Sequence, residues 1–243
     1  MKLIYDGTFE GFLTLVYDVY YEKLNVQDII KEQNYEALLL DEAKFIDTHK
    51  EKYEKVYQGI SSKFPKFYVE KIFNTFMCDS KEFEKDLLSF IILGFKDIKQ
   101  LENINYEFIA NLKALEHELF RHVHKMYAYA RFKELEDDTL YSQIESKFNV
   151  VYFLGKHFKK RFNNQNFIIH DINRKIAYIH TNEFKGIQNV ASFEQPQISK
   201  NEEKFDKLWK SFFNSVSIKE RENLKLQQNQ VPLLYRNMMN EFN

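Results

Sequence analysis

A short basic segment, KHFKKRF, offers the clearest chemistry in the chain. Residues 147–175 contain seven basic residues and one acidic residue, although the whole chain has a formal net charge of −1. Lysine and arginine neutralise phosphates, and neighbouring aromatic rings can stack on unpaired bases. The segment therefore predicts a nucleic-acid surface carried by four cations, Lys156, Lys159, Lys160 and Arg161.

A helix within FNVVYFLGKHFKKRF must position these cations. At about 100° per residue, four apolar side chains fall within one narrow arc and should face the core. The cations then face solvent, with Tyr152 and Phe153 beside them. The alternative is a solvated amphipathic helix whose aromatic rings are buried. The four apolar side chains are Val151, Leu154, Phe158 and Phe162.

Two histidines and one aspartate are candidate acid–base groups. His124, His157 and Asp171 would serve a nucleobase- or phosphate-processing enzyme, the alternative to a binding protein. Arg131 and Arg174 extend the predicted nucleic-acid surface if they converge with His157 and Asp171 at the ends of two hairpins. Equally, Asp171 and Arg174 would form a turn-stabilising ion pair. Because no nucleophile or metal accompanies these groups, binding is favoured over catalysis and enzyme activity stays open.

The histidine-rich stretch EHELFRHVH does not have metal-site spacing. Zincins place two histidines four residues apart on one helical face, whereas His117 and His122 are five apart. The chain contains one cysteine, so no cysteine pair is available as ligands. We expect no metal and no cofactor.

The composition is that of a globular protein with long regular elements. Hydrophobic residues make up 44% of the 243 residues, with only 6 Gly and 3 Pro. The single cysteine, Cys78, has no partner for an intramolecular disulfide, which fits a reducing compartment. We expect its thiol to be buried and inert. Asp6 and Glu10 interrupt any apolar run at the start, and no run reaches the roughly 20 residues needed to span a bilayer. We expect a cytoplasmic protein without membrane contact.

The stretch YDGTFEGFL is a strand–turn–helix junction. Residues 3–5 read as a strand, Thr8 as an N-cap, and Phe9 begins a helical apolar pattern. The glycine spacing and the lysine of a phosphate-binding loop are missing. We expect the N-terminal strand to join the sheet built later in the chain, because a lone strand is not stable.

The remaining elements predict one α+β domain over residues 1–243. Its parts are an N-terminal strand and helical block (1–127), a hairpin–helix–hairpin region (128–181) and C-terminal helices (199–243). The sheet should be small and mainly antiparallel, flanked by the helical block and the C-terminal helices.

Five motifs occur in an order that resembles a bacterial family of probable DNA metabolism proteins. They are YDGTFEGFL, HKMYAYARF, NVVYFLGKHFKKRF, FIIHDINRKIAY and LWKSFFNSVSIKEREN. The resemblance implies a DNA repair or modification context, a radical-SAM partner, and a relation to domains fused to uracil-DNA-glycosylase-like domains. It implies no particular reaction.

The resemblance also marks individual positions. These include Asp6, Gly7, Phe9, His124, Arg131, Phe132, His157, Phe158, Arg161, Phe162, Asp171, Arg174, Trp209, Arg221, Asn223 and Pro232. The chain departs from the family where His122 replaces an acidic residue and where PLLYR replaces a segment ending in Arg-Tyr-Trp. The resemblance implies an accessory protein that binds nucleic acid; a protein adaptor whose basic helix docks an acidic partner is a further alternative.

Overall fold

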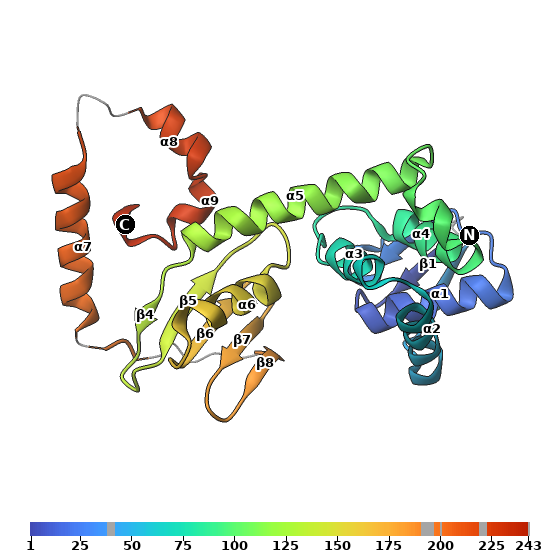
Figure 1. Cartoon of the computed structure of the whole chain (residues 1–243), viewed down its shortest axis with the longest axis horizontal. Helices are drawn as coiled ribbons and strands as arrows, with labels where there is room; N and C mark the ends of the chain where they lie inside the picture. Colours follow the sequence, from blue (N-terminus) through green and yellow to red (C-terminus); the bar gives the residue numbers. More distant parts are fainter. Residues whose placement is uncertain (38–41, 191–196, 200, 219–222, 243) are drawn as a thin grey trace. The chain divides into compact units, whose positions relative to one another are not determined.

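A computed structural model describes residues 1–37, 42–190, 197–199, 201–218 and 223–242 (Figure 1). The chain divides into two compact units, Met1–Leu119 and Phe120–Asn243. The predicted α+β class is confirmed, because both units combine helices with a sheet. The single predicted domain is replaced by two units, each with its own sheet.

The N-terminal unit is built on a parallel three-stranded sheet. The central strand β1 (Lys2–Tyr5) pairs with β2 (Asp28–Lys31) on one side and β3 (Ala43–Ile46) on the other. Helix α1 (Phe9–Glu22) connects β1 to β2, because parallel neighbours need a crossover connection. The prediction that β1 joins the later sheet is wrong: β2 and β3 supply both partners within the first 46 residues.

The predicted N-cap of α1 is confirmed. Thr8 Oγ1 accepts a hydrogen bond from the Gly11 backbone N–H at 2.9 Å. The Asp6 carboxylate in turn accepts from the backbone and hydroxyl of Thr8 and from the hydroxyl of Thr48, which lowers the pKa of Asp6 against the opposing effect of its partial burial. YDGTFEGFL is therefore a helix start, as the sequence indicates.

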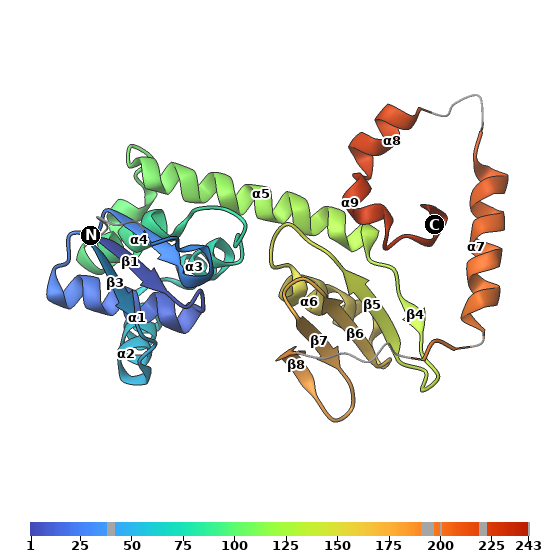
Figure 2. The same cartoon turned by 180° about the vertical axis from the view of Figure 1, so that it is seen from behind.

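Helices cover this sheet and supply most of its core (Figure 2). Cys78, after α3, is fully buried, as predicted. Helix α5 begins in this unit and ends in the next. The elements are η1 (Glu32–Asn34), α2 (Lys50–Lys63), α3 (Lys66–Phe76), α4 (Glu84–Lys96), η2 (Ile98–Glu102) and α5 (Glu107–Tyr129).

The C-terminal unit contains a mainly antiparallel five-stranded sheet in the order β4-β5-β6-β7-β8. Both predicted hairpins are present, and a further strand, β8, extends the second. The exception to antiparallel pairing is β5 with β6, because α6 (Val151–Phe162) crosses between them. The strands are β4 (Lys133–Glu134), β5 (Leu140–Ile144), β6 (Phe167–Asp171), β7 (Ile176–His180) and β8 (Lys185–Asn189).

The predicted C-terminal helices are confirmed in the described residues. Tyr129 at the end of α5 donates a hydrogen bond to the carbonyl of Gln230. Arg131 contacts Glu241 with Nη2 to Oε1 at 2.6 Å. These contacts attach the chain end to the unit. The elements are α7 (Glu202–Val216), α8 (Leu224–Gln230), α9 (Leu233–Arg236) and η4 (Asn240–Phe242), whereas Arg221 lies outside the described residues.

Across the parts of the chain that the structure describes, no helix is both long enough and apolar enough to cross a membrane.

Candidate nucleic-acid interface

Helix α6 packs on β6 and β7 by the face that its periodicity predicts (Figure 1). Val151, Leu154 and Phe158 are buried, and Phe162 is half-buried. Gly155 brings the helix unusually close to β7: a Cβ at this position would lie 2.2 Å from the ring of Tyr178. The close approach fixes which face of α6 is turned away from the sheet.

We expect Gly155→Ala to destabilise the C-terminal unit by about 1–3 kcal/mol, because the added methyl group overlaps the buried Tyr178 ring. In a helix without that ring, the same change would stabilise by about 1 kcal/mol through helix propensity. The sign of the change in melting temperature therefore reports the contact. In a Tyr178→Leu background the penalty should shrink or reverse, and an unchanged penalty there would contradict the packing described.

The outer face of α6 carries the four predicted cations. All four are exposed, as predicted. None is paired with a carboxylate of the described residues; Lys156 instead lies over the Tyr152 ring, with Nζ 5.1 Å from the centroid. Their charge is consequently available to a ligand. This basic ridge consists of Lys156, Lys159, Lys160 and Arg161.

Aromatic rings lie beside the basic ridge on α5 and α6. Tyr127 and His157 stack with centroids 4.0 Å apart and an interplanar angle of 15°. The ring of His124 meets Tyr127 edge-on at 6.4 Å. Burial, then the charges of Arg161 and Lys160, lower the pKa of His157, so its ring is neutral near pH 7. The sequence could not indicate this platform, because it forms only when two helices meet.

Arg131 and Arg174 both form ion pairs within the C-terminal unit. Arg131 pairs with Glu241, while Arg174 Nη1 lies 2.8 Å from an Asp171 oxygen. The predicted convergence of these groups into one phosphate cluster is therefore replaced by two separate ion pairs. Of the two readings of Asp171, the turn-stabilising pair is the one that the structure forms.

The three candidate acid–base groups do not form one cluster, because the two histidines lie beside Tyr127 and Asp171 pairs with Arg174. His124 and His157 both contact Tyr127. The Asp171 carboxylate is fully buried and accepts hydrogen bonds from the backbone and side chain of Arg174. A carboxylate held this way is not available to a substrate. The described residues contain no group of three or more metal-ligating side chains.

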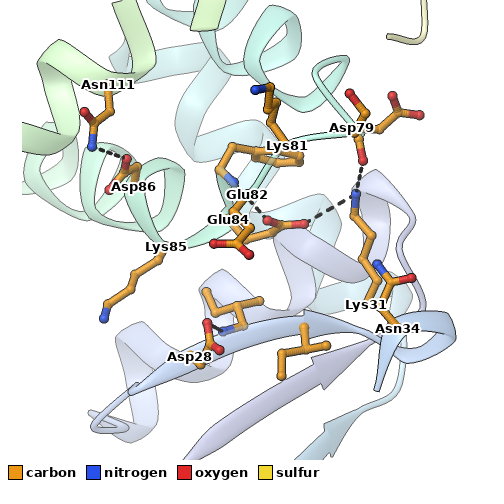
Figure 3. Close-up of a pocket in the computed structure, with 14 residues that line it drawn as sticks. Asp28, Lys31, Asn34, Asp79, Lys81, Glu82, Glu84, Lys85, Asp86 and Asn111 are labelled. Carbon is orange, nitrogen blue, oxygen red and sulfur yellow. Dashed lines mark hydrogen bonds and ion pairs between the residues drawn. The ribbon is translucent and has the colours of Figure 1, made fainter. Parts of the chain in front are cut away.

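A cavity of about 750 Å³ lies in the N-terminal unit, along the outer edge of β2 (Figure 3). Lys31 points across it toward the backbone carbonyl of Asp79 and the carboxylate of Glu84. Five acidic residues and three lysines line it, so it offers a phosphate no net positive charge. The acidic residues are Asp28, Asp79, Glu82, Glu84 and Asp86, and the lysines are Lys31, Lys81 and Lys85.

The candidate interface lies within a region of the chain that a family model matches. A domain of unknown function, DUF4130, matches residues 81–241, about two thirds of the chain. No curated protein and no solved structure matches the chain. The matched region includes the whole basic ridge and the rings beside it. The chain therefore belongs to the DUF4130 family.

Proposed function

We propose that this chain is a DNA-metabolism accessory protein of the cytoplasm, that it binds single-stranded nucleic acid through α6, and that it acts with a radical-SAM partner. The observation that supports binding is the basic ridge, four exposed cations that pair with no carboxylate in the described part of the chain. The DNA context and the radical-SAM partner are supported by the five-motif resemblance alone.

A single-stranded ligand suits the surroundings of the ridge better than a duplex. The Tyr127–His157 stack and the half-buried Tyr152 and Phe153 rings lie beside the lysines. Lysines can follow the phosphates while unpaired bases stack on such rings, which a duplex keeps hidden. Little sequence preference is expected from the ridge itself, because every base offers a π-face.

The test is the triple substitution of Lys156, Lys159 and Lys160 by alanine. Each phosphate contact contributes about 0.7 to the slope of log affinity against log salt for a single strand, so the slope should flatten by about 2. If the contacts contribute nothing at 1 M salt, affinity at 0.1 M should fall by about 100-fold. A salt titration of a fluorescent single strand measures both quantities.

A matched control removes the same charge elsewhere. Lys204, Lys207 and Lys210 are exposed on α7, and their replacement by alanine should leave the affinity and the salt slope near those of the parent. Thermal melting checks that both variants are folded. Equal losses in the two triple variants would mean that only net charge matters, and parent-like binding by the α6 variant would refute the proposal.

Protein binding is the second candidate function, and α7 favours it. Phe205, Leu208, Phe212 and Val216 recur at helical spacing, and each is more than half exposed. Isolated exposed apolar residues are common, but a continuous stripe often marks an interaction surface. If the parent binds no nucleic acid, an adaptor role becomes the better account.

A further inference from the structure

The ends of β6 and β7 bring two amide-rich segments together beyond the sheet. In the antiparallel register Phe167 faces His180, so the residues before Phe167 and after His180 leave the sheet at the same edge. The first segment follows directly from the end of α6, and its last residue accepts a backbone hydrogen bond from Leu140 at 3.0 Å. The second is held by a turn in which the Thr181 and Phe184 backbones are hydrogen-bonded.

These segments line an open cavity of about 180 Å³, here called the amide pocket. At about 30 Å³ per water, it has the volume of roughly six waters. It is smaller than the ~300–1,000 Å³ typical of sites for drug-sized ligands, so it suits one base rather than a whole nucleotide. Its lining includes five side-chain amides, those of Asn163, Asn164, Gln165, Asn166 and Asn182.

The amide side chains of the pocket are not used by the fold, whereas Thr181 Oγ1 is hydrogen-bonded to Phe184. Asn166 is half-buried and the other four amides are exposed. None of the five amide side chains is hydrogen-bonded to another residue in the described ranges. His180, 6% exposed, also lines the pocket, and its Nδ1 has no hydrogen-bond partner in those ranges. Buried polar atoms normally have partners, and an exception calls for an explanation.

The character of these groups indicates the ligand. Burial, then the charges of Lys185 and Lys159, lower the pKa of His180, so its imidazole is neutral near pH 7. Amides and neutral imidazole offer donors and acceptors together, and Lys185 adds a cation to the lining. A nucleobase edge carries both kinds of group, and side-chain amides pair with adenine through two hydrogen bonds.

We propose that the amide pocket receives one unpaired nucleobase, adenine above the others, from a strand whose phosphates follow the basic ridge. The inference rests on the proposed nucleic-acid function and deepens it. Lys159 connects the ridge with the pocket, because it belongs to the ridge and its charge helps to lower the pKa of His180. The lysines thus provide affinity along the backbone, and the pocket provides base preference.

The test compares the full chain with an Asn166→Ala/Asn182→Ala variant. Asn163 is left unchanged, because its φ of 47° favours asparagine over alanine. The probes are short oligo(dA), oligo(dT) and an abasic strand of equal length. The parent should bind oligo(dA) about 10-fold more tightly than oligo(dT). In the variant this preference should disappear, while its affinity for the abasic strand stays unchanged.

The abasic strand separates the two proposals. If the parent binds neither oligo(dA) nor the abasic strand, the proposed function fails and the pocket inference fails with it. If the parent binds oligo(dA) and oligo(dT) equally, only the pocket inference is overturned. A second readout does not need the lysines: the imidazole NMR signals of His180 should shift on adding deoxyadenosine monophosphate to the parent, and not to the variant. An unshifted signal in the parent would also overturn the pocket assignment.

Discussion

Replacing Arg174 with alanine is expected to lower the free energy of unfolding of the C-terminal unit by about 3–5 kcal/mol. The guanidinium lies 2.8 Å from the carboxylate of Asp171, which has no exposed surface. Without its partner the carboxylate would be a buried charge with no ionic compensation, and this accounts for most of the expected loss. Arg174 also donates to the carbonyls of Ser146 and Lys147, so the segment before α6 would lose two hydrogen bonds.

Urea denaturation followed by tryptophan fluorescence measures this loss. The chain contains one tryptophan, Trp209, which lies in the C-terminal unit, so the signal reports on that unit. Arg161→Ala is the matched control, because Arg161 is exposed and its removal should change stability by less than about 0.5 kcal/mol. An Arg174→Met/Asp171→Asn double variant, which leaves no charge buried, should recover much of the loss. A single variant as stable as the control would contradict the role assigned to this pair.

Local patterns sufficed to predict the elements that carry the candidate interface. The apolar arc of Val151, Leu154 and Phe158 identified both the helix and its buried face, so the exposure of the ridge lysines followed directly. The alternation on either side of DINR likewise predicted the hairpin of β6 and β7. In these segments, periodicity and turn residues agree with the tertiary structure.

The pairing of the strands could not be predicted in the same way. Strand β2 has only four residues, DIIK, with a charge at each end, so its signal is weak. The neighbours of β1 depend on how α1 folds back across the sheet, which is a tertiary property. A distant partner was therefore predicted for β1, whereas the nearer strands β2 and β3 form its sheet.

The roles of the arginines also depend on distant contacts. Arg131 and Glu241 are 110 residues apart, and no spacing rule connects them. A basic residue committed to an internal carboxylate looks the same in sequence as one free to bind phosphate. In the structure, Arg131 and Arg174 form ion pairs, whereas the four cations of α6 are exposed.

Replacing Glu84 with alanine is expected to lower the free energy of unfolding of the N-terminal unit by about 3–5 kcal/mol, because the buried Lys31 ammonium would lose its ionic partner. Lys31 Nζ lies 3.5 Å from Glu84 Oε1, and the two side chains are only 10% and 8% exposed (Figure 3). Glu84 also accepts hydrogen bonds from the Tyr5 hydroxyl and the Phe83 backbone N–H, both at 3.1 Å. Its removal would therefore leave three donors without this acceptor.

The size of the stability loss depends on the contacts that Lys31 and Tyr5 keep once Glu84 is removed. The Lys31 ammonium would keep the Asp79 carbonyl at 3.0 Å and the ring of Phe83, which compensate a charge only in part. Burial, then the negative charge of Glu84, raise the pKa of Tyr5 far above its usual range, so the phenol remains a neutral donor. Without Glu84, that donor would lie in the core without its acceptor.

Hydrogen exchange of the β1 amides, read by mass spectrometry, measures the loss in the unit concerned, because the core strand opens only when the unit does. In Glu84→Ala these amides should exchange faster by a factor of about 100 or more, as a loss of ~3 kcal/mol requires. Glu82→Ala is the matched control, since Glu82 is an exposed acid two residues away, and it should exchange like the parent. A Lys31→Met/Glu84→Leu/Tyr5→Phe variant removes the ammonium and the phenol together, and leaves only the Phe83 backbone N–H without this acceptor. Because apolar residues often replace a buried ion pair at no cost, its protection should return toward that of the parent. If this variant exchanges as fast as Glu84→Ala, lost packing rather than the buried charge explains the effect.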